Sequence, residues 1–174
     1  MVYGLLTKNN RSRTMILGDV LSANDIIENS KAGSKEEFIR EVSQFIAKNH
    51  RGIDPKELEN ILIEREKLGS TGLEEEIAIP HGKLKSLSEY VICFARNLKG
   101  IDFLSLDRKL KKLFFVVIVP ANNQTKQLKL LARISKIVKN KEFRKKLLEA
   151  KTAREIHQLI EERDSAFEEN NFIA

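Results

Sequence analysis

The sequence predicts an α/β fold, a single-domain sandwich in which a mixed, mostly buried sheet is flanked by helices on both faces. Segments typical of strands alternate along the chain with segments typical of helices. Two strand-like segments, residues 90–95 and 113–119, are continuously apolar, as expected for a sheet that is covered on both faces. With 174 residues, 41% of them hydrophobic, the chain is long enough for one domain with a substantial core.

The first two helices are indicated by signals at their N-termini. Ser34 and Glu37 form a capping box. Further along, Asp54 supplies an N-cap and Pro55 occupies the first helical position. The apolar residues that follow share one helical face in each case: Phe38, Val42, Phe45 and Ile46 after the first signal, and Leu58, Ile61 and Leu62 after the second.

Three further helices are expected towards the C-terminus. Asn140 is the N-cap of a short helix that carries Phe143 and Leu147, and Thr152 with Glu155 forms another capping box. Before these two, an apolar face indicates a longer helix, with the residues Leu128, Leu131, Ser135 and Val138. The strands expected between the helices cover residues 77–79, 90–95 and 113–119.

The domain is expected to span residues 16–162, with a loose N-terminal segment over residues 1–15 and a loose, acidic C-terminal tail over residues 163–174. No apolar stretch reaches the ~18 residues of a membrane span, and no signal peptide opens the chain, so a cytoplasmic protein is expected. The single cysteine, Cys93, lies in an apolar run and is interpreted as a small buried hydrophobic residue.

Residues 65–83 carry most of the functional information, because they place His81 between a proline and a glycine directly after a short apolar strand. Pro80 fixes φ and ends the strand, whereas Gly82 has no Cβ and lets a phosphate, a backbone or a partner come close. An imidazole held there is presented to its surroundings; the alternative is an ordinary surface histidine at a turn. No set of metal ligands accompanies it, so neither a metal nor a cofactor is expected.

Two motifs in this region resemble those of a known family. Arg-Glu-Lys-Leu-Gly-Ser-Thr-Gly over residues 65–72 and Ile-Ala-Ile-Pro-His-Gly-Lys over residues 77–83 resemble the mannitol/fructose-type (type 2) enzyme IIA of the bacterial phosphotransferase system, especially its nitrogen-regulatory branch. The resemblance covers about residues 16–162. It implies that His81 accepts a phosphoryl group from a phosphorylated HPr-like carrier.

Arg65 lies on the helical face that also carries Leu58 and Leu62. Its planar guanidinium suits bidentate recognition of a phosphoryl group. The alternative is that its stem covers the core while its head reaches solvent or pairs with Glu66. The resemblance places an arginine at this position close to the phosphohistidine, so Arg65 is expected to stabilise the phosphoryl group.

Ser70 and Thr71 lie between two glycines in a short polar turn whose hydroxyl and N–H groups suit an anion. We expect Ser70, Thr71 and Gly72 to line a phosphoryl pocket. A P-loop would need a lysine where this chain has Leu73, so nucleotide binding is not expected. Phosphoryl transfer depends mainly on positioning and electrostatic stabilisation, so the motif supplies the groups that the chemistry needs.

The chain departs from the family pattern at two places. Relatives usually have Gly-x-Gly where this chain has three glutamates, residues 74–76. A glutamate with positive φ costs roughly 1–2 kcal/mol, and its carboxylate repels a phosphoryl group, so glycines at positions 74 and 76 are expected to speed transfer about tenfold. Gln127 stands where relatives often have a second histidine, and its amide can donate a hydrogen bond but cannot carry a proton. It is expected in the phosphate pocket.

Charge is unevenly distributed within the net charge of +6. Residues 108–154 hold 15 basic and 2 acidic side chains, whereas residues 155–174 hold 1 basic and 6 acidic ones. Four of the basic residues recur at helical spacing and are called the basic ridge: Lys126, Lys129, Arg133 and Lys136. The ridge is interpreted as a solvated face balanced by the acidic tail, as a surface for an acidic regulatory partner, or as a contact for nucleic acid or anionic membrane.

Without interleaved aromatic residues in the ridge, nucleic acid is not expected as a partner. His50 is expected to be a solvated loop residue, and His157 to pack on a helix surface.

Two functions from different classes follow. The preferred one is a phosphocarrier that accepts a phosphoryl group on His81 and is regulatory rather than sugar-transporting, because no permease domain is attached. The alternatives are a regulatory protein-binding module with weak or lost phosphotransfer, and the IIA component of fructose or mannitol uptake.

Overall fold

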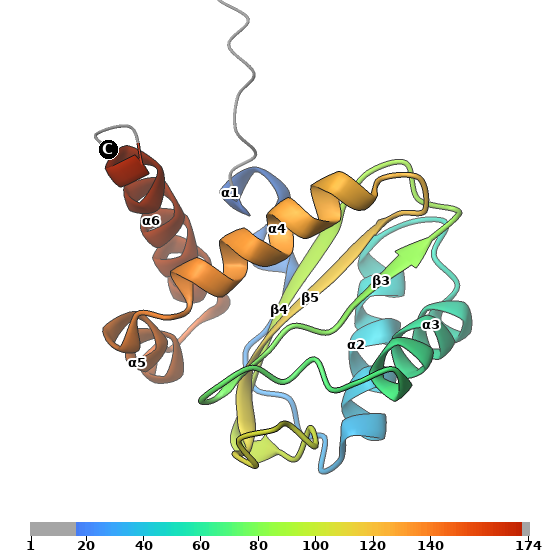
Figure 1. The fold of residues 1–174 in the computed structure, drawn as a ribbon, viewed down its shortest axis with the longest axis horizontal. Helices are drawn as coiled ribbons and strands as arrows, with labels where there is room; N and C mark the ends of the chain where they lie inside the picture. The colour runs from blue at the N-terminus through green and yellow to red at the C-terminus, as the bar shows by residue number, and fades with distance from the viewer. Residues whose placement is uncertain (1–16, 172–174) are drawn as a thin grey trace, which may run out of the picture.

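The computed structural model describes residues 17–171, and the loose segment expected over residues 1–15 lies outside them. The centre of the molecule is a five-stranded sheet in the order β1-β4-β5-β2, with β3 also paired to β5 (Figure 1). β4 and β5 are antiparallel and every other pair is parallel. The strands are β1 (Ile26–Ile27), β2 (Ile77–Ala78), β3 (His81–Leu84), β4 (Val91–Ile101) and β5 (Lys111–Pro120). The mixed sheet is confirmed.

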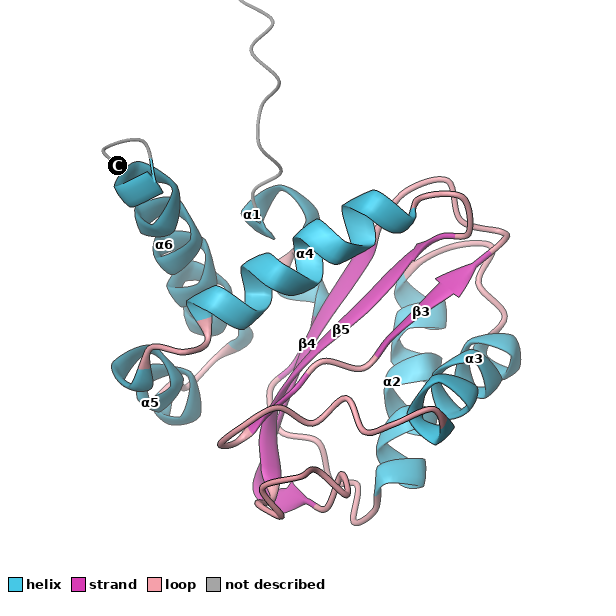
Figure 2. Ribbon diagram, viewed as in Figure 1, coloured by secondary structure: helices cyan, strands magenta, loops and turns pink. Residues whose placement is uncertain are grey.

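Helices cover both faces of this sheet (Figure 2). They are α1 (Leu17–Val20), α2 (Lys35–Asn49), α3 (Pro55–Lys67), α4 (Gln124–Ile137), α5 (Lys141–Glu149) and α6 (Ala153–Asn171), with a 3-10 turn η1 (Ala23–Asp25) after α1. Alternate residues of β5 divide between two cores: Phe115 and Val117 pack with α4, α5 and α6, whereas Phe114 and Val116 pack with α2 and α3. A strand buried on both faces must be continuously apolar, which is the pattern that the sequence showed.

The helix starts predicted from the sequence are confirmed. The Ser34 side chain accepts a hydrogen bond from the N–H of Glu37, and Asp54 caps α3 in the same way. Asn140 caps α5 by accepting from the N–H of Phe143. At α6 the hydroxyl of Thr152 accepts from the N–H of Glu155. Cys93 is fully buried in β4, as predicted, and burial raises the pKa of its thiol.

The face predicted for α4 was right only in part, because Val138, directly after the helix, is buried and Leu131 is partly buried against the core, whereas Leu128 is not. Leu128 is 68% exposed, and the residues that α4 buries are Gln127, Leu130, Ile134 and Ile137. Apolar residues occupy a wide arc of this helix, so helical spacing alone allows more than one buried face. The packing of α4 against β5 selects the face centred on Ile134.

The acidic C-terminal region also differs from the loose tail that was expected, because α6 continues to Asn171. Asp164 is completely buried and accepts hydrogen bonds from the N–H of Leu17 and from the guanidinium of Arg133. These contacts join α6 to α1 and α4. The spacing of apolar residues within α6 does not reveal such contacts with other helices. Among residues 17–171 no helix combines the length and the apolar character needed to cross a bilayer.

Candidate functional site

His81 is the first residue of β3 and is half-buried. Its Nδ1 atom lies 2.8 Å from the carbonyl oxygen of Ile79. Pro80 separates β2 from β3, so the chain along this edge of β5 is interrupted immediately before the histidine. The interruption folds the Ile79 carbonyl back to the ring and fixes the imidazole's orientation.

Arg65 reaches the other side of the imidazole from the last turn of α3. Its Nε atom donates to His81 Nε2 at 3.1 Å, and its Nη1 atom donates to the Gly69 carbonyl at 2.9 Å. Because an arginine always donates, Nε2 is the accepting nitrogen of the ring. The proton of the neutral ring therefore lies on Nδ1, where the Ile79 carbonyl accepts it, and the lone pair lies on Nε2.

The surroundings keep this imidazole neutral. Burial lowers the pKa of His81 below its ordinary value, and the positive charge of Arg65 lowers it further. The backbone hydrogen bond to Ile79 and the charge of Glu66 act in the opposite direction without reversing the shift. At neutral pH the ring is therefore in its unprotonated, nucleophilic form.

His81 and Arg65 face an open cavity of about 630 Å³. Gln127 also lines it, so the structure brings three of the predicted site residues together. The complete lining is Asn60, Ile61, Glu64, Arg65, Leu68, His81, Gly82, Lys83 and Gln127.

Sequence reasoning missed Lys83 as a lining residue, although the period of a strand places it on the same face as His81. Gly82 was expected to let a phosphate, a backbone or a partner come close, but the group that approaches it is a side chain of α3. A Cβ at this position would lie 2.6 Å from Cγ2 of Ile61, so the glycine allows α3 to pack on β3. That close packing is what brings Arg65 to the histidine.

The predicted pocket residues Ser70, Thr71 and Gly72 are placed differently. The Ser70 hydroxyl donates to the Phe103 carbonyl at 2.5 Å and accepts from the N–H of Gly72 at 3.0 Å. The Thr71 hydroxyl donates to the carboxylate of Glu66. Both hydroxyls are thus engaged within the protein, and neither residue is in the lining of the His81 cavity. Their contribution to phosphate binding stays a prediction.

The glutamates at positions 74–76 do not act as the sequence analysis expected. Glu75 pairs with Lys109 at 2.9 Å and Glu76 with Arg144 at 3.3 Å. The hydrogen bond from Lys109, together with its charge, lowers the pKa of Glu75. None of the three lines the His81 cavity, so repulsion of a phosphoryl group has no structural basis here. A positive φ of 58° occurs at Glu75, and not at positions 74 and 76 where it was anticipated.

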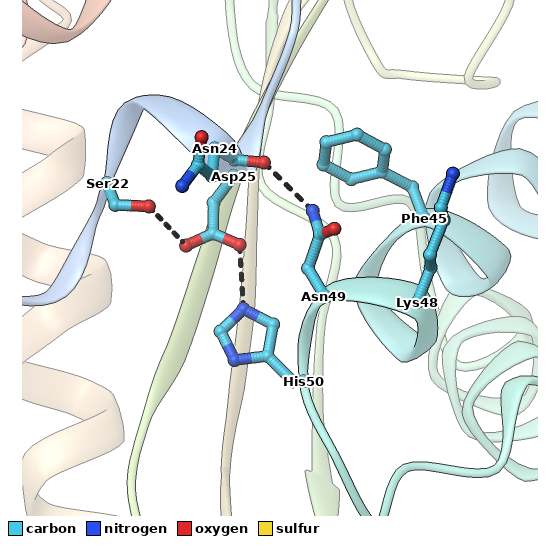
Figure 3. A pocket seen from close by; sticks show the side chains of 7 residues that line it. All are labelled: Ser22, Asn24, Asp25, Phe45, Lys48, Asn49 and His50. Carbon is cyan, nitrogen blue, oxygen red and sulfur yellow. Dashed lines mark hydrogen bonds and ion pairs between the residues drawn. The ribbon is translucent and has the colours of Figure 1, made fainter.

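His50 is not the solvated loop residue that was expected. It lies in a pocket of about 390 Å³, where its Nε2 atom is 2.7 Å from Oδ1 of the buried Asp25 (Figure 3). Asp25 also accepts from the Ser22 hydroxyl, and the Asn49 amide donates to the Asn24 carbonyl. These contacts tie η1 to the end of α2. His157 lies against helix α1, with its Nε2 atom 2.7 Å from the Leu21 carbonyl.

The basic ridge is partly engaged within the molecule. The guanidinium of Arg133 pairs with Asp164 of α6, and it also lies over the ring of Phe167. Lys136 lies over the same ring, 6.0 Å from its centroid, and Lys126 lies 5.5 Å from the centroid of Tyr90. Asp164 and Phe167 of α6 therefore cover one side of the ridge, while Lys129 stays exposed.

The chain matches known proteins over most of its length. The family model described as "Phosphoenolpyruvate-dependent sugar phosphotransferase system, EIIA 2" matches residues 19–163. A nitrogen regulatory protein of Bradyrhizobium diazoefficiens is 32% identical over 146 residues, which cover 84% of this chain and 95% of that protein. The fructose-specific EIIABC component of Bacillus subtilis is 31% identical over 150 residues, 86% of this chain but only 24% of the relative.

Solved structures agree with this match. The nitrogen regulatory protein IIA-Ntr of Neisseria meningitidis has a TM-score of 0.78 at 27% identity, covering 83% of this chain and 98% of its own. The mannitol IIA of Escherichia coli has a TM-score of 0.69 at 22% identity, covering 80% and 98%, and shares the fold.

The protein belongs to the type 2 EIIA family of the phosphoenolpyruvate-dependent phosphotransferase system, as its two motifs predicted. Membership supports a phosphocarrier role.

Proposed function

We propose that the protein is a cytoplasmic phosphocarrier that accepts a phosphoryl group on Nε2 of His81 from a phosphorylated HPr-like protein. The observation that carries the proposal is the pair of hydrogen bonds on the imidazole, from Nδ1 to Ile79 and from Arg65 to Nε2. Together they leave the lone pair on Nε2 of a histidine that lines the cavity.

In the proposed reaction the Nε2 lone pair attacks the phosphorus atom of the donor's phosphohistidine. A new N–P bond forms at His81 while the N–P bond of the donor breaks, and the donor's imidazole keeps the electron pair. The Nδ1 proton stays in place, and the Ile79 carbonyl stabilises the positive charge that the phosphorylated ring acquires. Arg65 exchanges its contact with Nε2 for the phosphoryl oxygens, which its planar fork suits.

The other groups around the cavity fit this role. Lys83 adds a second positive charge, and the Gln127 amide supplies a neutral hydrogen-bond donor. Two exposed leucines offer apolar surface to a docking partner: Leu68, which lines the cavity and is 86% exposed, and Leu128, which adjoins Gln127 and is 68% exposed. The carrier reading is favoured over a binding module that has lost phosphotransfer, because the Arg65–His81 pair is intact.

A regulatory role is proposed over sugar transport. The supporting observations are the similarity to a nitrogen regulatory protein over 95% of that relative and the TM-score of 0.78 to the IIA-Ntr structure. Target proteins are proposed to dock on the exposed part of the basic ridge, around Lys126 and Lys129. Fructose or mannitol uptake is the alternative, and it requires transfer of the phosphoryl group to a IIB acceptor.

The test is incubation of the protein with phosphoenolpyruvate, enzyme I and HPr, followed by intact-mass measurement. One acid-labile phosphate per chain is the expected result. A second incubation adds a fructose-type IIB protein to the phosphorylated chain. Retention of the phosphate supports the regulatory role, and rapid loss to IIB supports the uptake role. If no label is acquired from HPr or from a nitrogen-type HPr homologue, the phosphocarrier proposal is wrong.

A further inference from the structure

Four leucines lie exposed on one short segment at the far end of the long hairpin. They belong to residues 98–110, which run from the end of β4 into the loop before β5 (Figure 1) and are called the leucine loop. Leu98 is 44% exposed, Leu104 71%, Leu106 104% and Leu110 49%. Single exposed leucines are ordinary, but four of them in one surface segment indicate an interaction site.

The loop is held in this form by a buried cation. Lys111 is completely buried, and its Nζ atom donates to the carbonyls of Leu73 and Glu75 and to the carboxylate of Asp107. Leu104 and Arg108 both have left-handed backbones, with φ of 52° and 56°. Such strained residues persist only where the surrounding structure fixes them. The leucines are therefore directed outwards by a defined scaffold.

Positive charge surrounds these leucines. Four basic side chains lie on or beside the loop: Lys99, Arg108, Lys109 and Lys112. Lys109 pairs with Glu75, whereas Lys99, Arg108 and Lys112 have no acidic partner among the described residues.

The nearby carboxylates are already engaged. Asp107 pairs with Lys111. The hydrogen bonds from Lys111 and from the Ser105 hydroxyl keep the pKa of Asp107 well below its usual range. Asp102 accepts a hydrogen bond from the N–H of Leu104. The surface of the loop is therefore apolar at its centre and basic at its rim.

We propose that the leucine loop binds the surface of an anionic lipid bilayer. Membrane affinity of a peripheral segment grows with inserted apolar area and with attraction of Lys and Arg to anionic lipids, and the loop supplies both. A second copy of the chain is a poor occupant, because two basic rims would face each other. Leu106, fully exposed, protrudes; a fluid bilayer accepts such a tip without a matching pocket.

This surface is separate from the histidine site. His81 pairs with Val117 of β5, six residues beyond Lys111, which corresponds to roughly 20 Å along the strand. The cavity lining contains no residue of the loop. A chain attached to a bilayer through the loop would keep His81 available to a protein partner, and the inference does not depend on the proposed phosphotransfer.

The chain contains no tryptophan, which allows a direct test. Leu106→Trp places a reporter at the tip of the loop, and Leu128→Trp places a matched reporter on an exposed leucine of α4. We expect a blue shift and stronger emission of the Leu106→Trp protein with vesicles of equimolar phosphatidylcholine and phosphatidylglycerol. Vesicles of phosphatidylcholine alone, and the Leu128→Trp control, should leave emission unchanged.

Cosedimentation with the same vesicles tests the apolar and the electrostatic contributions to binding separately, in the protein without tryptophan. Leu104→Ser with Leu106→Ser should lower partitioning at least about tenfold, because it removes the most exposed apolar area. Arg108→Gln should lower it about fivefold and weaken its salt dependence. Lys85→Gln, an exposed lysine outside the loop, is the matched control. Circular dichroism confirms that each variant is folded.

The proposal is overturned if the parent protein does not sediment with anionic vesicles, or if it binds with equal affinity after both leucines are replaced. Binding that Lys85→Gln weakens as much as Arg108→Gln would also overturn it, because that result would reflect net charge alone. Concentration-dependent dimerisation lost in the leucine variant, without vesicle binding, would assign the loop to a second copy instead.

Discussion

Arg65 and His81, sixteen residues apart in sequence, form a hydrogen bond of 3.1 Å in which the guanidinium Nε donates to the imidazole Nε2. An arginine that donates to a histidine nitrogen occupies the position that a phosphoryl group would take. In the proposed reaction Nε2 is the attacking atom, and the resting contact holds beside it the guanidinium that is proposed to stabilise the phosphoryl group.

Replacing His81 with alanine should abolish phosphorylation by the HPr-driven system and leave the fold intact, because the side chain is only half-buried at a strand start. Intact mass measures the label, and circular dichroism measures the fold. His50→Ala and His157→Ala are the controls and should be labelled like the parent. Peptide mapping of the phosphate to His50 or His157 would refute the assignment.

Replacing Arg65 with lysine should slow phosphotransfer by roughly 10- to 100-fold, since one charge-assisted hydrogen bond is worth about 1.5–3 kcal/mol. Lysine keeps the charge but cannot form a planar fork. The rate is measured by rapid quench with phosphorylated HPr. Arg51→Lys, at an exposed arginine, is the control for a general effect of the substitution. A rate equal to that of the parent would show that Arg65 only packs.

The imidazole of His81 should titrate below the ordinary histidine pKa of about 6.5, because burial and Arg65 both disfavour its charged form. The neutral, reactive ring then predominates at pH 7, and phosphoryl acceptance should fall only when the pH drops well below 6.5. NMR titration of the His81 ring checks this. Arg65→Gln removes one of the causes and should move the midpoint upwards. A midpoint at or above 6.5 in the parent would contradict the prediction.

Glycine at positions 74 and 76 should leave the phosphotransfer rate within about twofold of the parent at low and high salt. Glu76 is paired with Arg144, none of the three glutamates lines the His81 cavity, and the exposed carboxylates are screened. The two rates are compared by rapid quench. A rate increase of about tenfold that disappears in high salt would contradict this prediction and support repulsion between the glutamates and the phosphoryl group.

Within residues 74–76 the backbone strain lies at Glu75, the residue with a positive φ, and not at positions 74 and 76. Glu75→Gly should be more stable than Glu75→Ala by about 1 kcal/mol, because only the alanine has a Cβ in the left-handed region. Both variants lose the ion pair with Lys109, so that loss cancels in the comparison. Urea unfolding measures the difference, and equal free energies of unfolding would show that the segment relaxes without cost.

Asp164→Ala should destabilise the protein by about 3 kcal/mol, because it removes a completely buried carboxylate that accepts from the N–H of Leu17 and pairs with Nε of Arg133. Asp164→Asn keeps an oxygen acceptor and should cost less. Thermal and urea unfolding measure both. A change below about 0.5 kcal/mol for the alanine variant would mean that α6 contributes little to the fold.

Local signals in the sequence predicted the five longer helices and the strands β2, β4 and β5, and they identified the central motif. The capping residues Ser34, Asp54 and Asn140 each satisfy backbone N–H groups within three residues, so the information that starts a helix is contained in a few neighbouring positions. The continuous apolar run of β5 likewise required a sheet covered on both faces. His81 could be identified because Pro80 and Gly82 adjoin it in the chain.

Only the tertiary structure decided which distant groups meet. The wide apolar arc of α4 left its buried face open until contact with β5 selected Ile134. His50 contacts Asp25, which lies 25 residues earlier in the chain, and Asp164 contacts Arg133, which lies 31 residues earlier. The period of a helix or strand determines which side chains share a face of that element, whereas these contacts depend on how separate elements pack. The sequence therefore identified His81 as the candidate nucleophile, and the packing of α3 on β3 determined that Nε2 is the nitrogen that accepts from Arg65.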